Sequence, residues 1–526
     1  MALKIVVCDH IHQSGLDLLQ AQNDIVFENL ASLSKDELRQ SIKDADVVIT
    51  RSSTDVDEAF LENAQNLTSI VRAGVGVDNV DIPMCSKKGI VVMNVPTANT
   101  IAAVELTMAH LISSVRNFPG ANQQLKNERK WKREDWYGTE LKGKTLGIIG
   151  FGNIGSRVGK RAKAFEMEVV AYDPYIDASK AIDAGVRYTS NFEDILQCDI
   201  ITIHTPKNNE TKNMITAKEI AKMKDGVILI NCARGGLYNE DDLYEGLKSG
   251  KIRWAGLDVF NKEPAIDNKL LDLPNVYVTP HIGANTLESQ EKIAIEAAHA
   301  AIEAARGSSY PNALNLPVKE VDLPHNIKLY LELTQKLSFI CTQANKGVFR
   351  SLEITACGEV SHYGDSLKTF ALVGALSASL GDHINYVNAP FVAQERGVEV
   401  KFVGQELSQT YKNHIKITLS TQQNIFSIEG AVFEDKYLRI TTINGFVFDI
   451  EPTGKMILFR NTDVPGVIGM VGNTLAKHKI NIADFRLARK DKEALAVVIV
   501  DDDVSQEVLQ ELESIPACLG LKYVVI

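Results

Sequence analysis

The feature that most constrains the fold is a glycine-rich turn in the first half of the chain. The apolar segment Thr145–Ile149 runs directly into GFGNIG, which places Gly150, Gly152 and Gly155 between a predicted strand and a predicted helix. The first glycine permits a tight turn, the second lets backbone N–H groups approach a pyrophosphate, and the third lets the helix pack close to the sheet. The N-terminus of that helix adds unpaired N–H donors and a partial positive charge. The pattern predicts a dinucleotide-binding unit in a parallel sheet.

A carboxylate at the end of the next predicted strand extends this pattern. The segment EVVAYD ends in Asp173, close to the expected spacing of about 20 residues from the turn. A carboxylate there accepts hydrogen bonds from both adenosine ribose hydroxyls and repels a 2′-phosphate, and no Lys or Arg stands beside Asp173 to offset that repulsion. The alternative interpretation is a structural glycine turn with a surface aspartate. The order of strand, turn, helix, strand and acid favours the first, with NAD as the cofactor.

Short apolar segments alternate with helical patterns over the first three hundred residues. Strands buried on both faces read as continuous apolar runs, so these segments predict parallel sheets flanked by helices. A first unit has predicted strands at Lys4–Cys8, Asp46–Thr50, Ser69–Arg72 and Ile90–Asn94. A second unit has predicted strands at Thr145–Ile149, Glu168–Tyr172, Ile200–His204, Val227–Asn231, Trp254–Val259 and Val276–Thr279. Predicted helices include Ile101–Val115, Asn153–Phe165, Asn239–Lys248 and Thr286–Arg306. We expect two α/β units, each a doubly wound parallel sheet.

The rest of the chain has a different pattern. Pro311 and Pro317 mark a boundary, after which an α+β mixture includes predicted strands at Ile415–Leu419 and Gly430–Phe433. From Gly454 the predicted order is ferredoxin-like βαββαβ, with elements at Lys455–Arg460, Gly466–Lys477, Ile480–Ala488, Ala494–Val500, Gln506–Glu513 and Gly520–Val525. We expect domains at residues 1–96 (completed by 285–311), 97–284, 312–453 and 454–526.

Composition excludes several classes of protein. The net charge of −11 argues against a nucleic-acid-binding surface, which needs clustered Lys and Arg. The seven cysteines form no CxxC pair, so neither a zinc site nor a dithiol redox motif is indicated, and their spread suits a reducing compartment. The first residues, MALKIVVCDH, lack the pattern of a signal peptide or membrane span. We expect a cytoplasmic protein without a metal or a membrane partner.

Three charged residues each follow a predicted strand of the second unit: Arg234 in NCARGG, Glu263 in DVFNKEP and His281 in TPHIGA. Ligands of open α/β sheets bind beyond the carboxyl ends of the strands, so all three are expected at the cofactor edge. Histidine exchanges protons near neutral pH, a neighbouring carboxylate stabilises its imidazolium, and a guanidinium grips a carboxylate by two hydrogen bonds. Taken singly, each has an ordinary structural interpretation. Their joint placement predicts oxidation of a hydroxy acid.

These segments, with HTP at His204–Pro206, resemble the D-isomer-specific 2-hydroxyacid dehydrogenases over residues 1 to about 310. The resemblance implies that Arg234 anchors the substrate carboxylate, that His281 is the acid/base and that Glu263 is its partner. It implies a substrate-binding domain, completed by the helix near 286–310, that is hinged against the NAD-binding domain. It also implies cofactor contacts from Gly150, Gly152, Asn153, Ile154, Gly155, Asp173, Thr205, Cys232, Ala233, Arg234, Asp258, His281 and Gly283.

The first unit is expected to select the substrate. Arg51 follows one predicted strand, and Arg72 with the loop Gly74, Val75 and Gly76 follows another. The loop could present N–H groups to a carboxylate, and Arg51 could face a phosphate or could be a solvated loop residue. VRAGVGVDNVD and VPTANTIAAVELT resemble the 3-phosphoglycerate dehydrogenases. This implies D-3-phosphoglycerate as substrate, Asn99 in the substrate loop, and Lys132 and Arg133 of WKREDW as cations supplied by a neighbouring subunit.

The C-terminal half resembles the long forms of those enzymes. YVNAPFVAQERGV at Tyr386–Val398 is similar to their allosteric substrate-binding domain, and NTDVPGVIG with KINIADF is similar to an ACT domain. The resemblance implies L-serine as effector, held by Asn461, Asp463 and Asn481 across a domain pair, and a homodimer or homotetramer. The alternative is an ACT unit that serves only oligomerisation.

Other functions stay open at this point. Another D-2-hydroxy acid, such as 2-hydroxyglutarate or glycerate, would use the same residues. An NAD-sensing scaffold without turnover, or an amino-acid sensor, would be built on the same fold. The ACT-like unit and the absence of long recognition tails argue against the scaffold.

Overall fold

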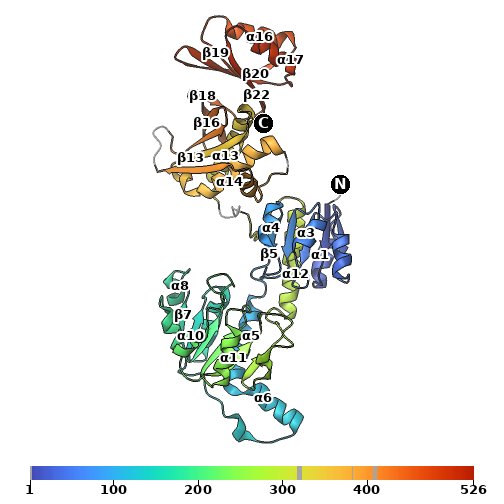
Figure 1. Ribbon diagram of the computed structural model, residues 1–526, viewed down its shortest axis with the longest axis vertical. Coiled ribbons are helices and arrows are strands. Elements are labelled where there is room, and N and C mark those ends of the chain that lie inside the picture. Colours follow the sequence, from blue (N-terminus) through green and yellow to red (C-terminus); the bar gives the residue numbers. More distant parts are fainter. Residues whose placement is uncertain (1–2, 317–322, 382, 407–410) are drawn as a thin grey trace.

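The computed structural model describes residues 3–316, 323–381, 383–406 and 411–526, and these form four β-sheets arranged along an elongated molecule (Figure 1). In the view of Figure 1 the C-terminal sheet lies at the top, the third sheet below it, then the N-terminal sheet, and the second sheet at the bottom. The predicted boundary residue Pro317 lies outside the described residues.

The N-terminal sheet is fully parallel, with strand order β2-β1-β3-β4-β5. Its strands are β1 (Leu3–Val7), β2 (Ile25–Asn29), β3 (Val47–Thr50), β4 (Ser69–Arg72) and β5 (Val91–Asn94). Helices α1 (Gln13–Gln20), α2 (Lys35–Ser41), α3 (Glu58–Asn63), α4 (Ile82–Lys87) and α12 (Leu287–Ala305) accompany it. Helix α12 comes from much later in the chain, and its alanine-rich face shares a buried core with β1, β3 and β4. The small side chains of that face permit close packing on the sheet.

The second sheet is also parallel, with order β12-β11-β10-β9-β6-β7-β8. Its strands are β6 (Thr145–Ile149), β7 (Glu168–Tyr172), β8 (Arg187–Tyr188), β9 (Ile200–Ile203), β10 (Val227–Asn231), β11 (Ile252–Leu257) and β12 (Val276–Val278). Its helices are α5 (Thr100–Arg116), α7 (Asn153–Ala164), α8 (Ala178–Asp183), α9 (Phe192–Leu196), α10 (Ala217–Lys222) and α11 (Glu240–Lys248), with the short 3-10 turn η3 (Lys269–Asp272). Strand order reverses between β6 and β9, where ligands of doubly wound sheets bind.

An arm leaves the second sheet after α5. It consists of α6 (Phe118–Gln123), the π-helical turn η1 (Gln124–Glu128) and the 3-10 turn η2 (Arg133–Trp136), and it projects from the bottom of the molecule in Figure 1. Its large side chains are exposed, including Phe118, Trp131 and Tyr137. Apolar groups left in water on a projecting segment are typical of a surface that contacts another chain.

The third sheet is mixed, with order β14-β13-β15-β16-β17-β18. Its elements are α13 (His325–Ala344), β13 (Phe349–Cys357), η5 (Glu359–Tyr363), α14 (Gly364–Leu380), α15 (Ala389–Glu395), β14 (Glu399–Gln405), β15 (His414–Thr421), β16 (Ile425–Phe433), β17 (Tyr437–Ile443) and β18 (Phe446–Ile450). Alternate residues of β15 are buried, as expected for a sheet covered on one face by α13.

The C-terminal sheet is antiparallel, with order β20-β21-β19-β22. The elements β19 (Lys455–Thr462), α16 (Val467–Lys477), β20 (Ile482–Lys490), β21 (Glu493–Val500), α17 (Gln506–Glu513) and β22 (Cys518–Val525) confirm the predicted βαββαβ order. The two central strands are buried on both faces, because helices cover one face and the third sheet contributes to the core on the other.

The fold class is as expected, but β2 and β8 of the parallel sheets and β13, β14, β17 and β18 of the third sheet were not among the predicted strands. Strand β2 is an edge strand with only Ile25 buried, and β8 has two residues at the other sheet's edge. Edge strands lack the continuous apolar run that marks a central strand. No helix of the described residues is long and apolar enough to cross a membrane.

Candidate active site

The glycine turn adopts the geometry that its sequence predicts. Gly150 directly follows β6 with φ +87°, and a Cβ there would lie 2.7 Å from the carbonyl oxygen of His204. A Cβ on Gly155 would lie 2.1 Å from the carbonyl oxygen of Gly150. No heavy atom stands within 4 Å of the Cβ position of Gly152 among the atoms described, so this side of the turn is open. The turn leaves room for a ligand at the N-terminus of α7.

Asp173 lies beside this turn at the end of β7. Its Oδ2 accepts a hydrogen bond from the backbone N–H of Phe151 at 2.9 Å, and its Oδ1 accepts one from Tyr175 at 3.0 Å. These contacts fix the carboxylate next to the glycine turn. An acceptor held there suits the adenosine ribose of a dinucleotide.

A cleft of about 390 Å³ lies between the two parallel sheets. Three polar atoms in its lining are buried without a hydrogen-bond partner among the described residues: Asn99 Oδ1, His204 Nδ1 and Thr205 Oγ1. Buried polar groups are normally paired, so this cluster indicates a site that a polar ligand completes. Of the predicted residues, the cleft is lined by Val75, Gly76, Asn99, Asn153, Ile154, Thr205, Cys232, Ala233, Arg234, Asp258, His281 and Gly283.

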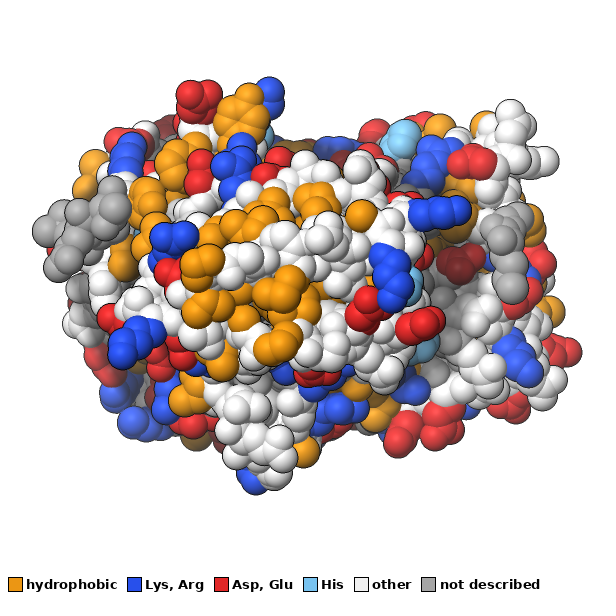
Figure 2. Space-filling model, turned by 90° about the horizontal axis from the view of Figure 1, so that it is seen from above, with side chains coloured by type: hydrophobic (Ala, Val, Ile, Leu, Met, Phe, Trp, Pro, Cys, Tyr) orange, Lys and Arg blue, Asp and Glu red, His pale blue; other side chains and the backbone are white. Residues whose placement is uncertain are grey.

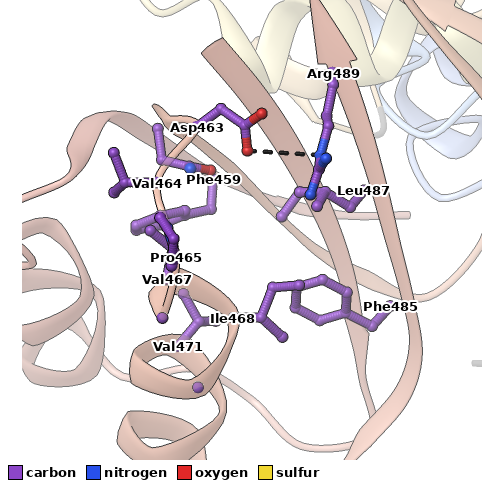
Figure 3. Close-up of a pocket in the computed structure, with 14 residues that line it drawn as sticks. Phe459, Asp463, Val464, Pro465, Val467, Ile468, Val471, Phe485, Leu487 and Arg489 are labelled. Carbon is purple, nitrogen blue, oxygen red and sulfur yellow. Dashed lines mark ion pairs between the residues drawn. The ribbon is translucent and has the colours of Figure 1, made fainter. Parts of the chain in front are cut away.

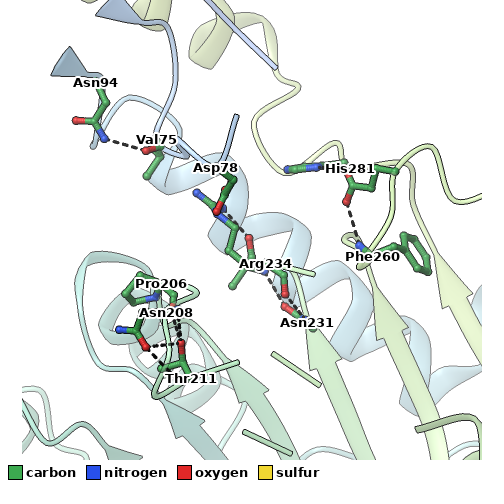
Figure 4. Close-up of polar contacts among 12 residues, drawn as sticks. Val75, Asp78, Asn94, Pro206, Asn208, Thr211, Asn231, Arg234, Phe260 and His281 are labelled. Carbon is green, nitrogen blue, oxygen red and sulfur yellow. Dashed lines mark hydrogen bonds and ion pairs between the residues drawn. The ribbon is translucent and has the colours of Figure 1, made fainter. Parts of the chain in front are cut away.

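A histidine–carboxylate pair stands at this cleft (Figure 4). His281 Nδ1 lies 2.7 Å from Glu263 Oε2, while Glu263 Oε1 accepts the N–H of Phe260 at 3.0 Å. The hydrogen bond to Glu263 raises the pKa of His281 above its ordinary value, although partial burial opposes the shift. Burial raises the pKa of Glu263, but the hydrogen bonds from His281 and Phe260 outweigh it and lower that pKa overall. The pair therefore favours imidazolium beside carboxylate.

The backbone around His281 is held by Asp258, a fully buried residue at the end of β11. The Asp258 carboxylate accepts the N–H groups of Ile282 and Gly283, both at 2.8 Å. The His281 N–H donates to the carbonyl oxygen of Asp258 at 2.9 Å, and His281 has φ +53°, a left-handed conformation uncommon for a side-chain-bearing residue. Burial raises the pKa of Asp258.

Arg234 faces the first sheet from the end of β10 (Figure 4). Its Nε lies 3.3 Å from Asp78 Oδ2, and its Nη1 donates to the carbonyl oxygen of Ala233 at 2.7 Å. A Cβ on Gly76 would lie 2.6 Å from Arg234 Nη2, so the glycine admits the guanidinium to the loop. Asp78 is a contact that sequence reasoning missed, because nothing in the local pattern links it to a residue so distant in sequence.

Arg72 lies close enough to both Arg234 and Arg51 to feel their charges. Burial, and then the nearby charges of Arg51 and Arg234, lower the pKa of Arg72 to about 10, and burial also lowers the pKa of Arg51. Arg72 Nε is buried without a hydrogen-bond partner in the described part of the chain. A Cβ on Gly74 would overlap Arg72 Nη1, so this side chain folds over the loop. Arg72 thus lies among three guanidinium charges that Asp9 and Asp78 offset only in part, and such a cluster favours an anion.

Some predicted residues do not line the cleft. Arg51, Arg72 and Gly74 stand behind its lining, and Glu263 contacts it through His281. Arg133 is exposed on the projecting arm, and among the described residues no hydrogen bond or ion pair joins it to Arg51. Cys232 lines the cleft, but burial raises the pKa of its thiol and keeps it protonated.

A second pocket, of about 560 Å³, lies in the C-terminal sheet (Figure 3). Its lining is largely apolar, and across it Asp463 Oδ1 lies 3.5 Å from Arg489 Nε. Asn461 also lines it, with Oδ1 buried and unpaired within the described chain. Asn481 does not line this pocket and instead donates to Asp501 at 2.6 Å. Arg489 was not identified from the sequence, because a charge at the end of an edge strand carries no local signal.

Three family models match the chain. The NAD-binding domain of the D-isomer specific 2-hydroxyacid dehydrogenases matches residues 108–283, the D-3-phosphoglycerate dehydrogenase intervening domain matches residues 326–444, and the ACT domain matches residues 455–517. The described residues contain no group of three or more His, Cys, Asp or Glu that could hold a metal ion.

Similar proteins extend over the full length. A D-3-phosphoglycerate dehydrogenase of Methanocaldococcus jannaschii is 39% identical, with 98% of each chain covered, and one of Bacillus subtilis is 37% identical, with 99% of each covered. Among solved structures, a D-lactate dehydrogenase of Aquifex aeolicus complexed with NAD and lactic acid is 29% identical, with a TM-score of 0.52, and covers 58% of this chain and 96% of its own. The chain therefore belongs to the D-3-phosphoglycerate dehydrogenase family, with the NAD-binding, intervening and ACT domains of that family.

Proposed function

We propose that this protein oxidises D-3-phosphoglycerate to 3-phosphohydroxypyruvate with NAD⁺, the first step of L-serine biosynthesis. The observation that supports this most is the His281–Glu263 pair, 2.7 Å apart, at the same cleft as Arg234. A proton acceptor and a carboxylate anchor at one cleft are the groups that oxidation of a 2-hydroxy acid requires.

The roles of the chain's own residues follow from their chemistry. Arg234 grips the substrate carboxylate by two hydrogen bonds, assisted by N–H groups of the loop Gly74, Val75 and Gly76. His281 accepts the hydroxyl proton at Nε2, because its Nδ1 is bonded to Glu263. Glu263 stabilises the imidazolium and keeps the ring oriented. NAD⁺, when bound, accepts the hydrogen of the substrate C2 atom with its electron pair.

The glycine turn and the cleft suit that cofactor. Gly150, Gly152 and Gly155 admit its pyrophosphate to the N-terminus of α7, and Asp173 is held where the adenosine ribose belongs. The remaining residues that we assign to NAD line the cleft, and they are Asn153, Ile154, Thr205, Cys232, Ala233, Arg234, Asp258, His281 and Gly283.

The arginine cluster supports a phosphorylated substrate. The charge of Arg51 lowers the pKa of Arg72, and an anion placed between the two side chains relieves that repulsion. Neither is paired with a carboxylate at salt-bridge distance in the part of the chain described. We assign the substrate phosphate to this cluster, with Asn99 in the substrate loop and Arg133 arriving from a second subunit.

We further propose a homodimer or homotetramer in the cytoplasm. The exposed aromatic residues of the arm, Phe118, Trp131 and Tyr137, supply one contact surface. A second surface lies at the top of the molecule, where the space-filling view shows hydrophobic side chains gathered together (Figure 2). Exposed apolar residues at this end include Val464, Ile468 and Met470. Pairing of two ACT domains there would bring Asn481 of one chain toward the pocket of the other.

L-serine is the effector that we propose for the C-terminal pocket. Asn461 has a buried oxygen with no hydrogen-bond partner among the described residues, and Asp463, in the segment that leads into α16, lines the same pocket. An amide oxygen and a carboxylate accept hydrogen bonds from an ammonium group, while helix N–H groups bind a carboxylate. We assign Asn461, Asp463 and Asn481 to this site, and we propose the boundaries 1–96 with 285–311, 97–284, 312–453 and 454–526 for the four domains.

The test is NADH formation from NAD⁺ and D-3-phosphoglycerate, with the oxo product trapped, beside D-2-hydroxyglutarate and D-glycerate, with and without L-serine. We expect turnover of phosphoglycerate that falls when serine is added. Turnover of an unphosphorylated acid alone would refute the phosphate assignment. Binding of NAD⁺ without any turnover would refute the enzymatic function.

A further inference from the structure

A buried histidine that the reaction does not use lies behind the loop that carries His281. His110 belongs to α5, is 5% exposed, and its Nε2 lies 2.9 Å from Thr279 Oγ1. Thr279 Oγ1 lies in turn 2.6 Å from Asp258 Oδ1. His110, Thr279 and Asp258 thus form a continuous hydrogen-bonded chain that ends on the carboxylate that holds the His281 loop.

Elementary hydrogen-bond rules give this chain a direction. An ionised carboxylate only accepts, so Thr279 uses its single O–H proton toward Asp258. The oxygen of Thr279 must then accept from His110, which places the His110 proton on Nε2. Burial lowers the pKa of His110 to about 4, so its ring is neutral at physiological pH and has only this one N–H proton.

The sheet makes room for the His110 ring. Gly256 in β11 lies directly under it, since a Cβ there would stand 2.9 Å from His110 Cβ and 3.1 Å from His110 Nδ1. Any larger residue at 256 would push the ring from Thr279. The ring position is thus determined by two independent features, the hydrogen bond to Thr279 and the missing side chain of Gly256.

Asp258, the last member of this hydrogen-bonded series, contacts the loop that carries His281. Asp258 accepts two backbone N–H groups just after His281, and the His281 N–H bonds to the carbonyl oxygens of Asp258 and Thr279 at 2.9 and 3.0 Å. This is the segment in which His281 is held at φ +53°. A left-handed non-glycine residue persists only where its surroundings hold it, and these bonds supply that restraint.

We propose that His110 is a positioning residue for His281: by donating to Thr279 it orients the hydroxyl toward Asp258, which keeps the His281 loop in the conformation that pairs the imidazole with Glu263. This inference rests on the proposed role of His281. It adds a residue of α5 to the groups that position the acid/base His281. The N-terminus of the same helix follows Asn99 of the proposed substrate loop.

The test compares His110→Leu, which removes the donor, with His110→Gln, whose amide can donate from a similar reach, in the full chain. Ser114→Ala is the matched control, because Ser114 is buried on the same helix and its hydroxyl bonds only the helix backbone, at the His110 carbonyl oxygen. The readout is the rate at which diethyl pyrocarbonate modifies His281, followed across pH by peptide mass spectrometry. This rate reports the pKa of His281 whether or not the protein turns over substrate.

We expect His110→Leu to lower the apparent pKa of His281 by about half a unit to one unit, because the ring loses its fixed approach to Glu263. The Gln and Ser114→Ala variants should keep the wild-type value. A Leu variant with an unchanged His281 titration, or a Gln variant shifted as far as Leu, would overturn the proposal. If His110→Leu does not fold, Thr279→Val against Thr279→Ser makes the same comparison. Failure of phosphoglycerate turnover in the wild type would refute the proposed function and leave this titration to decide the positioning role.

Discussion

The cleft between the parallel sheets and the pocket in the C-terminal sheet each have an ion pair in their lining, but they are built differently. The cleft collects residues from positions 75 to 284, with a histidine–carboxylate contact of 2.7 Å set on a buried aspartate. The C-terminal pocket collects residues from positions 459 to 496, with a 3.5 Å ion pair whose arginine is 68% exposed. The His281–Glu263 pair is itself half-exposed, but the loop that carries His281 is held by the fully buried Asp258, so we expect chemistry at the first site and modest, adjustable binding at the second.

The largest effect should come from His281→Asn, which removes the proposed proton acceptor. We expect kcat for phosphoglycerate oxidation to fall roughly a thousandfold, because general acid–base groups contribute about 10²- to 10⁴-fold. Calorimetric binding of L-serine should be unchanged, since the C-terminal pocket is assembled from its own segment. A loss below tenfold would show that another group accepts the proton.

Arg234→Lys should reduce catalysis less than His281→Asn does, and its effect should be confined to the cleft. A lysine keeps the charge and loses the two-pronged grip, so kcat/KM should fall about 10- to 100-fold, equivalent to about 1.5–3 kcal/mol. Asp78→Asn is the matched control, because it removes the charge that Arg234 faces and leaves the guanidinium. Steady-state kinetics in both directions measure the effect. Equal losses in the two variants would assign Arg234 to an ion pair instead of the substrate.

Glu263→Gln tests whether the pair is electrostatic. Glu263 raises the pKa of His281, so the amide should lower it, and less imidazolium should remain at neutral pH. Reduction of the oxo acid needs imidazolium, so its rate should fall by at most about tenfold for each unit by which the pKa is lowered. The full loss should be reached only above the wild-type pKa, and the loss should disappear below the new pKa. Coincident pH–rate profiles of variant and wild type in both directions would contradict this role.

The smallest effect is expected at the second pocket. Arg489→Met breaks an exposed ion pair, which contributes at most about 1 kcal/mol, so the serine dissociation constant should change by no more than about fivefold. Met keeps much of the apolar stem of the side chain. Calorimetry of serine binding to the full-length variant measures it. A change above a hundredfold would mean that Arg489 binds the effector directly and that the two sites are more alike than their exposure suggests.

Local pattern accounts for most of the fold. The glycine turn, Asp173 and the six elements of the C-terminal sheet could all be predicted, because each depends on spacing within a few dozen residues. Edge strand β2 was missed because water faces much of it. Pairs such as Arg234 with Asp78, Arg489 with Asp463, and His110 with Thr279 could not be predicted, since they join segments far apart in sequence whose approach depends on packing. The placement of Arg234, Glu263 and His281 after three strands was enough to predict one common edge.

The chain passes between the two parallel sheets twice, once between β5 and α5 and again between β12 and α12. Two connecting segments make a hinge between the two sheets. A single connection would let the two domains rotate about several axes. Two connections restrict them chiefly to rotation about the one axis that joins the two connecting segments. Each closing stroke would then return Arg234 to the same place opposite the Gly74–Gly76 loop. Proteolytic cleavage of either connecting segment would leave the two domains joined by the other segment. The domains could then rotate in more directions, so closure into the arrangement that brings Arg234 opposite the loop would be slower.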